Sequence, residues 1–263
     1  MGLRNRGKAT PQDFNKKGAK FIGKITRETE TRGVYAPSIC TATMVSESIV
    51  LSAAHCVTSI EDRAKFTKGR ILFQLGYNEL ENTKIHETHL KIIKTGSKKT
   101  AFYGRASLDF SYDWVLLEME TPYNKIGAMK IADVKDLRDL KDLSLMVAGY
   151  GHSFSKGQYI TIQDSCSARN EVNKDLYAID CDTSVGDSGA PIYTCDAAGE
   201  CTIYGINSGT SVRPQKNISL ARLYRETGHP YHFDPKDQDN DKFNRINIIV
   251  GAGAFKDAYL DLL

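Results

Sequence analysis

Short apolar runs recur along the chain from residue 21 onward, and polar turn segments separate them. Short runs of this kind, bounded by turn residues, predict β-strands, and a long series of them predicts barrels or sandwiches. We therefore predict an all-β fold. The expected strands cover residues 39–45, 49–53, 70–77, 88–94, 114–118, 145–150, 159–163, 177–180, 190–194, 202–208 and 219–222.

Three segments depart from this strand pattern. Residues 132–143 place an apolar side chain at nearly every third position, which drifts off one helix face and predicts at most a short helix or turn. Residues 255–263 place aromatic and leucine side chains on one face of a helix, so we expect a terminal helix packed on the body. Residues 1–20 are rich in Lys, Arg, Asn and Gly and predict a disordered or pro-type arm.

The composition of the 263 residues is ordinary for a globular protein, with 41% hydrophobic and 25% charged residues. A net charge of +3 gives no reason to expect nucleic acid or a membrane surface as a partner. The basic stretch at 91–105 is interrupted by apolar residues, so we interpret it as a strand and a solvated loop, with a site for an acidic partner as the alternative. No run approaches the roughly 18 apolar residues of a membrane span.

Six cysteines form an even set, which predicts disulfides and an oxidising compartment. We therefore expect a secreted or periplasmic protein. Residues 1–20 lack the apolar core of a signal peptide, so mature or trimmed numbering is expected.

Metal-binding patterns are weak in this sequence. No Cys-x-x-Cys or His-x-x-x-His pattern competes as a metal site, so no metal or other cofactor is expected. Asp237, Asp239 and Asp241 hint at calcium but lack the glycine and distal glutamate of an EF-hand loop, and a solvated loop is the preferred interpretation. Asn217 begins a glycosylation sequon that matters only if the source organism glycosylates.

The stretch 181–191 reads Cys-Asp-Thr-Ser-Val-Gly-Asp-Ser-Gly-Ala-Pro and places Ser188 in a glycine-rich turn. Gly186 and Gly189 free the backbone for a tight turn that other residues resist. Such a turn can aim successive N–H groups at one point, as a tetrahedral oxyanion requires. Ser188 is therefore a candidate nucleophile.

A serine hydroxyl needs a base, and the base needs an orienting group. His55, in Leu-Ser-Ala-Ala-His-Cys, is the candidate base, and Asp113, in Asp-Trp-Val-Leu-Leu, is the candidate orienting group. Asp109 lies four residues earlier and is the rival to Asp113. We prefer Asp113 because an apolar strand follows it at once and anchors it in the body.

These three motifs, in the order His, Asp, Ser, resemble the chymotrypsin-fold serine endopeptidases. The resemblance covers roughly residues 25–255. The gap of 75 residues from Asp113 to Ser188, with Cys-Asp-Thr before the serine turn, is similar to the bacterial glutamyl-endopeptidase-like branch. The resemblance implies two six-stranded antiparallel barrels with the active site between them. Here that places an N-terminal arm or candidate pro-segment at 1–24, the first barrel at 25–130 and the second, with the C-terminal helix, at 131–263.

The resemblance also implies the roles of the site residues. Ser188 attacks the carbonyl, His55 transfers the proton, and Asp113 holds the tautomer of His55. The oxyanion hole would be made by the backbone N–H groups of Gly186 and Ser188.

A disulfide pairing follows from the resemblance together with local spacing, since sequence alone permits many connectivities. In the family two cysteines form a bridge beside the catalytic histidine, and a second pair brackets a short hairpin turn, which leaves the remaining two. The expected pairs are Cys40–Cys56, Cys195–Cys201 and Cys166–Cys181.

Asp187 has two interpretations. In trypsin-like members the matching acid pairs with a new N-terminal amine made by zymogen cleavage. Lys20 and Phe21 resemble such a cleavage site, although Phe21 lies only 19 residues before Cys40, which is shorter than trypsins use. The alternative is a hydrogen-bonded structural Asp187.

The substrate pocket is predicted from positions near the serine. Asp182 lies six residues before the predicted nucleophile, where trypsin-like enzymes hold a carboxylate that favours Arg or Lys. Alternatively, Asp182 belongs to the Cys-Asp-Thr turn and points elsewhere. Asn207 stands where glutamate-specific relatives have histidine, and Thr183 could still bond an acidic or polar side chain. Ser208 and Gly209 are expected to form one wall.

We therefore predict a monomeric serine endopeptidase that acts on protein or peptide substrates through an acyl-enzyme, without a cofactor. Two alternatives stay open: a catalytically silent binding or adhesion module on the protease fold, and an esterase on the same scaffold.

Overall fold

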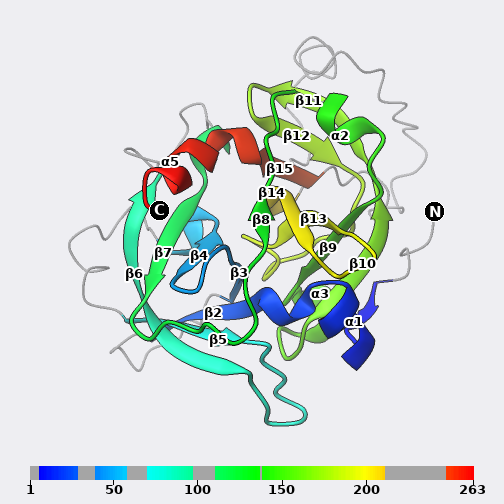
Figure 1. Ribbon diagram of the computed structural model, residues 1–263. Coiled ribbons are helices and arrows are strands. Elements are labelled where there is room, and N and C mark those ends of the chain that lie inside the picture. Colours follow the sequence, from blue (N-terminus) through cyan, green and yellow to red (C-terminus); the bar gives the residue numbers. More distant parts are fainter. Residues whose placement is uncertain (1–5, 29–38, 58–69, 97–109, 137, 211–246) are drawn as a thin grey trace, which may run out of the picture.

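The computed structural model describes residues 6–28, 39–57, 70–96, 110–136, 138–210 and 247–263 (Figure 1). Several sequence predictions lie outside these residues. They are the strand at 219–222, the rival acid Asp109, the aspartates at 237–241 and the sequon at Asn217.

The first body is a closed barrel of six strands, in the order β2-β3-β4-β7-β6-β5, on the left of Figure 1. All of its neighbouring strands pair antiparallel. Apolar side chains in the central strands are buried, as the runs at 39–45 and 49–53 predict. The strands are β2 (Ile22–Glu28), β3 (Cys40–Met44), β4 (Ile49–Ser52), β5 (Arg70–Leu75), β6 (His86–Thr95) and β7 (Val115–Met119).

The second body is a nine-stranded sheet in the described residues, where the sequence predicts a six-stranded barrel. Six antiparallel strands run in the order β10-β9-β13-β14-β15-β12, and β1, β11 and β8 extend them, β8 pairing parallel with β14. The N-terminal arm contributes β1, the connection between the bodies contributes β8, and the segment before β12 contributes β11, which pairs with β12. The strands are β1 (Gly7–Lys8), β8 (Lys130–Ile131), β9 (Leu145–Gly149), β10 (Thr161–Cys166), β11 (Ala168–Asn173), β12 (Leu176–Ile179), β13 (Pro191–Cys195), β14 (Cys201–Thr210) and β15 (Asn247–Gly251).

Helices are few and short in the described ranges, so the predicted all-β class is confirmed. None of the helices in the described part of the chain is long and apolar enough to cross a membrane. The α-helices are α1 (Pro11–Lys16), α2 (Arg138–Lys141), α3 (His152–Ser155) and α5 (Lys256–Leu260). The 3-10 turns are η1 (Ala19–Phe21), η2 (Ala54–Cys56), η4 (Phe110–Tyr112) and η5 (Ala252–Ala254).

The N-terminal arm is folded onto the second body from residue 6 onward, which corrects the disorder predicted for it. Thr10 and Asp13 form a reciprocal capping box at the start of α1, and such a box satisfies two backbone N–H groups of the first helical turn. The hydroxyl of Tyr193 donates to the carbonyl of Lys17 at 2.7 Å. Strand β2 begins at Ile22, inside the predicted arm.

The predicted C-terminal helix forms as α5 and returns to the first barrel, as the red segment of Figure 1 shows. The hydroxyl of Tyr259 donates to the carbonyl of Val45 at 2.6 Å. The rings of Trp114 and Phe255 lie 6.3 Å apart between centroids. These contacts join the two bodies beside Asp113, the neighbour of Trp114.

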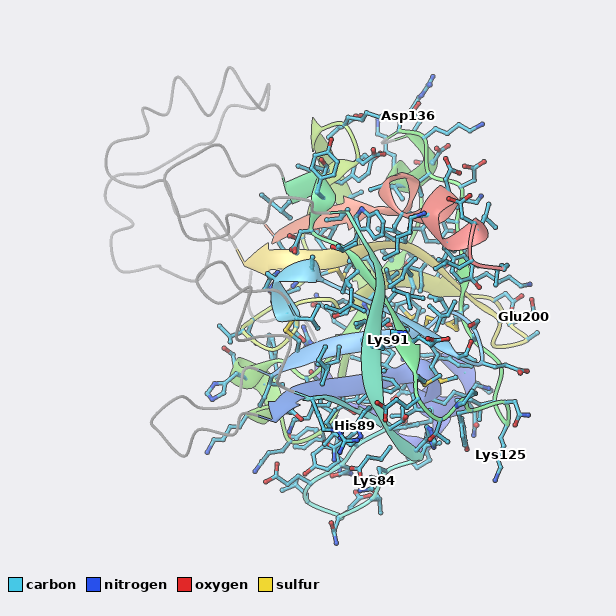
Figure 2. All side chains as sticks on the ribbon, turned by 90° about the vertical axis from the view of Figure 1, so that its left-hand side faces the viewer. Lys84, His89, Lys91, Lys125, Asp136 and Glu200 are labelled. Carbon is cyan, nitrogen blue, oxygen red and sulfur yellow. A yellow bond between two sulfur atoms is a disulfide. The ribbon has the colours of Figure 1, made fainter. Side chains whose placement is uncertain are left out.

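Most charged side chains of the described residues lie on the outside of both bodies. Figure 2 shows Lys84, Lys125, Asp136 and Glu200 projecting from the periphery. The largest fully buried side chains include Tyr150, which donates to the carbonyl of Tyr77 at 3.1 Å. Several of the buried polar side chains, among them Asp113, Asp187 and Ser208, belong to the candidate site.

Candidate active site

The register of two barrel strands places the predicted base and its orienting acid at one end of the barrel. Strands β4 and β7 pair antiparallel, with Ser52 opposite Val115. His55 follows β4 within η2, and Asp113 comes just before β7. Because antiparallel neighbours start and end at the same edge, residues after β4 and before β7 must meet.

His55 and Asp113 are joined by two hydrogen bonds. The Nδ1 atom of His55 lies 2.8 Å from Oδ2 of Asp113, and the backbone N–H of His55 donates to Oδ1 at 2.9 Å. Asp113 is 1% exposed. An ionised carboxylate only accepts hydrogen bonds, so Nδ1 carries the proton and Nε2 keeps its lone pair. This tautomer is the one a general base needs.

A third donor reaches Asp113 from the other body. The hydroxyl of Ser208, on β14, donates to Oδ2 of Asp113 at 2.5 Å and is buried. The sequence predicts Ser208 only as a pocket wall, since nothing in its local pattern links it to a residue 95 positions away. The carboxylate is thus held from both the barrel and the sheet.

The turn that carries Ser188 is anchored to the same end of the barrel. The backbone N–H of Thr41 donates to the carbonyl of Ser188 at 2.9 Å. At Gly189, with φ of +79°, an added Cβ would lie 2.2 Å from Oγ of Ser52, so the turn packs directly on β4. The chain then continues from Ser52 to His55. Main-chain contacts therefore bring Ser188 to the barrel end that bears His55, and the Ser188 hydroxyl makes no hydrogen bond within the described residues.

Several N–H groups of this turn have no partner in the described part of the chain, and those of Gly186 and Ser188, the two expected oxyanion donors, are among them. The carbonyls of Val185 and Gly186 are bound by donors from outside the turn. Thr41 donates from Oγ1 to the carbonyl of Gly186 at 2.8 Å, and the backbone N–H of His152 donates to the carbonyl of Val185 at 2.7 Å. Unpaired donors on a fixed backbone form a ready anion site.

Glycine is required at Gly186 for this geometry. Its φ of +99° is outside the range that side-chain-bearing residues favour, and an added Cβ would lie 2.3 Å from the carbonyl oxygen of Tyr150. This crowding agrees with the expectation that Gly186 belongs to a tight turn that other residues resist.

A family model described as Trypsin matches residues 12–224. The chain belongs to the trypsin family. A solved structure of a Glu endopeptidase in complex with MPD is similar in fold, with a TM-score of 0.63 over 100% of this chain and 97% of that chain. The sequence identity is 17%, so the likeness shows the chymotrypsin-like fold alone. No curated protein matches the sequence.

In this trypsin-family chain Asp187 pairs with an arginine side chain. Its carboxylate is fully buried, with Oδ1 at 2.5 Å from Nη2 of Arg6 and Oδ2 accepting from the N–H of Ser184 at 2.9 Å. Burial raises the pKa of Asp187, and the charge of Arg6 opposes that rise. The backbone N–H of Phe21, the candidate N-terminus if the arm were cleaved, donates to the carbonyl of Gly18 at 3.0 Å. Zymogen cleavage stays a prediction, and sequence reasoning missed Arg6.

The predicted pocket residues lie around the serine turn, but they are engaged in different ways. The N–H of Asp182 donates to Oε1 of Gln163 at 2.7 Å. Thr183 is buried, and its hydroxyl has no partner within the described residues. The Nδ2 atom of Asn207 donates to the carbonyl of Asp187 at 3.0 Å, so this amide supports the turn. Among the described residues, no atom lies within 4 Å of a Cβ built on Gly209.

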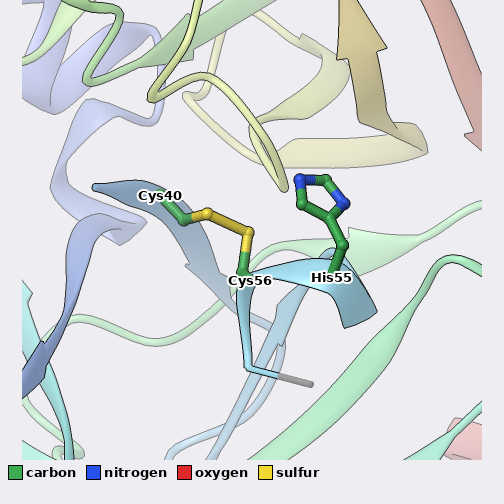
Figure 3. A group of neighbouring side chains, drawn as sticks. All are labelled: Cys40, His55 and Cys56. Carbon is green, nitrogen blue, oxygen red and sulfur yellow. A yellow bond between two sulfur atoms is a disulfide. The ribbon is translucent and has the colours of Figure 1, made fainter. Parts of the chain in front are cut away.

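The three disulfides of the structure link Cys40–Cys56, Cys166–Cys181 and Cys195–Cys201. Figure 3 shows the first of them beside the imidazole of His55. The ligand-type atoms of Cys40, His55 and Cys56 lie within 4.8 Å of one another. Both sulfurs are bound in the disulfide, so they supply no thiolate for a metal ion.

Proposed function

We propose that this trypsin-family chain is a serine endopeptidase that cleaves peptide bonds through an acyl-enzyme. The observation that carries the proposal is the paired His55 and Asp113 at the barrel end where the turn of Ser188 is anchored. The N–H groups of Gly186 and Ser188 in that turn would supply the oxyanion donors that acyl transfer requires.

The reaction starts with attack of the Ser188 hydroxyl oxygen on the substrate carbonyl, while Nε2 of His55 takes the hydroxyl proton. Asp113 stabilises the imidazolium that forms, and the N–H groups of Gly186 and Ser188 hold the oxyanion. Collapse of the tetrahedral intermediate breaks the peptide C–N bond, and His55 gives its proton to the leaving amine. Water then hydrolyses the acyl-enzyme by the same steps, with His55 as base.

We propose protein or peptide substrates with Arg or Lys before the scissile bond, recognised by the carboxylate of Asp182. The contact of Asn207 supports this preference over glutamate, since its amide binds the backbone of Asp187 and offers no positive charge. Three disulfides and the family membership support a secreted or periplasmic location, and we expect a monomer.

Labelling with a fluorophosphonate probe, combined with hydrolysis of a peptide library, tests the proposal. We expect the probe to label the protein, Ser188→Ala to abolish labelling and hydrolysis, and Ser153→Ala, an exposed serine on α3, to change neither. The library reads the preferred residue before the cleaved bond.

Each alternative predicts a different result. Labelling that persists in Ser188→Ala contradicts the assignment of the nucleophile. Absence of labelling and hydrolysis in the unmodified protein favours a silent binding module, and hydrolysis of esters without peptides favours an esterase.

A further inference from the structure

The side chain of Arg6 is buried beneath the serine turn, with 1% of its surface exposed. Its Nη2 pairs with Asp187 at 2.5 Å, its Nη1 donates to the carbonyl of Asp182, and its Nε donates to Oγ1 of Thr161 at 2.9 Å. The ring of Phe154 covers one face of the guanidinium at 4.3 Å. A side chain from the N-terminal arm therefore occupies a fully built site.

We propose that Arg6 is a positioning residue for the oxyanion hole. The guanidinium bonds both ends of the segment 182–187, at the carbonyl of Asp182 and the carboxylate of Asp187. In the sequence, the N–H of Gly186 lies between these two attachments, and the N–H of Ser188 directly follows the second one. This inference rests on the proposed function and adds a residue that nothing in the motif pattern assigns.

The carboxylate of Asp187 is closely enclosed by the chain around it. A Cβ built on Gly149 or Gly151 would lie 2.8 or 2.3 Å from an oxygen of the carboxylate, so backbone closes two sides of it. The N–H of Ser184 occupies the second oxygen. Within the described residues, Arg6 is the cation paired with this carboxylate.

Loss of Arg6 would leave a buried carboxylate without a counter-charge, which is strongly unfavourable. The carboxylate can relieve this by taking a proton or by moving toward water. Burial already raises the pKa of Asp187, and Arg6 is the main opposing influence. We expect either response to weaken the bond from the N–H of Ser184 to the carboxylate, and so to disturb the turn that carries the two oxyanion donors.

The contact also gives the arm a role in the active enzyme. The family resemblance assigns the charge opposite Asp187 to a new amine made by cleavage, whereas here a side chain 181 residues away supplies it. An arginine needs no chain cleavage to be positive at any ordinary pH. We therefore infer that the arm stays attached while the enzyme works.

The test compares Arg6→Ala with the unmodified protein on a peptide substrate. We expect kcat to fall about 100-fold with a much smaller change in KM, since loss of one oxyanion donor costs about 10²–10³ in kcat. Affinity for a peptide boronic acid, which forms a tetrahedral adduct, should fall in the same proportion. Lys8→Ala, two residues further along the arm on strand β1 and with a 43% exposed side chain, should leave all three values unchanged.

A second variant covers the case in which Arg6→Ala folds poorly. Arg6→Met combined with Asp187→Asn removes both buried charges, so we expect a melting temperature near that of the unmodified protein and a kcat that remains low. Added guanidinium ion at millimolar concentration should restore part of the activity of Arg6→Ala. A folded double variant with unchanged kcat would overturn the inference, as would unchanged kcat in Arg6→Ala.

Failure of this inference is distinguishable from failure of the proposed function. Activity that survives Ser188→Ala removes the endopeptidase mechanism itself. Activity that is lost in Ser188→Ala but unchanged in Arg6→Ala removes only the role of Arg6.

Discussion

Substitution of Asp113 by asparagine should abolish most of the activity while leaving the fold intact. Asparagine has the same shape, but one of its two terminal groups is an NH₂ donor. Three donors converge on Asp113 in the structure, two from His55 and one from Ser208. The single oxygen of an amide cannot accept all three of these hydrogen bonds. The NH₂ group of asparagine therefore either faces another donor, or donates to Nδ1 of His55 and makes that nitrogen the acceptor.

The magnitude depends on which of these outcomes occurs. Loss of one charge-assisted hydrogen bond costs about 1.5–3 kcal/mol, or roughly 10- to 150-fold in rate. If His55 instead accepts at Nδ1, its proton moves to Nε2 and it can no longer take the proton of Ser188. A wrong tautomer of this kind costs about 10⁴ in kcat, or about 5.4 kcal/mol. We predict the larger loss, because His55 donates to Asp113 at both its ring and its backbone.

The assay is kcat/KM on the best library peptide at pH 7, with a thermal melt to verify folding. Asp109→Asn is the matched control and also decides between the two candidate acids. We expect Asp109→Asn to retain near-normal activity, since the Nδ1 atom of His55 already faces Asp113 at 2.8 Å. A folded Asp113→Asn variant within tenfold of the unmodified enzyme would refute the reasoning.

Three further outcomes follow from the same structure. Ser208→Ala should lower kcat/KM by about 10- to 100-fold, since one charge-assisted bond to the carboxylate is lost and the tautomer is kept; a loss as large as that of the asparagine variant would contradict this. Gly189→Ala should lower the free energy of unfolding by about 2–5 kcal/mol in urea titrations, because its Cβ would lie 2.2 Å from a hydroxyl and 2.4 Å from a carbonyl at a positive φ. Gly127→Ala is its control, with a positive φ but nothing within 4 Å, and should cost only about 1–2 kcal/mol. Replacing both Cys40 and Cys56 by alanine opens a loop of sequence separation 16 and should cost about 3 kcal/mol in the same titration, and a change under about 1 kcal/mol would count against it.

The sequence predicts those elements and contacts that are encoded in short runs of consecutive residues. The apolar runs at 39–45 and 49–53 form β3 and β4, and the motifs around them identify the residues that β4 and β7 bring together. The sequence does not predict strand β11, because Ala168–Asn173 is mostly polar. This segment forms a strand through its pairing with β12. A strand with little apolar pattern of its own gives no signal until its partner is known.

The arm shows a second limit of sequence patterns. Residues 1–20 have a composition typical of disorder, yet α1 and β1 form there because the second body supplies the partners. Arg6 is one of several lysine and arginine residues in this segment, and nothing in its neighbouring sequence sets it apart from the others. Only the three-dimensional position of Asp187 distinguishes it from them.

The contact between Ser208 and Asp113 depends on packing outside the motifs. Ser208 lies on β14, which pairs with β15, and the chain leaving β15 carries Phe255 to the ring of Trp114. Trp114 is the immediate neighbour of Asp113. The segment that places Ser208 therefore continues into Phe255, which packs against the residue next to Asp113. Motif spacing specifies which residues take part, but the distance between them is set by how the barrel and the sheet dock. The orientation of Asp113 is therefore a property of the interface between the two bodies.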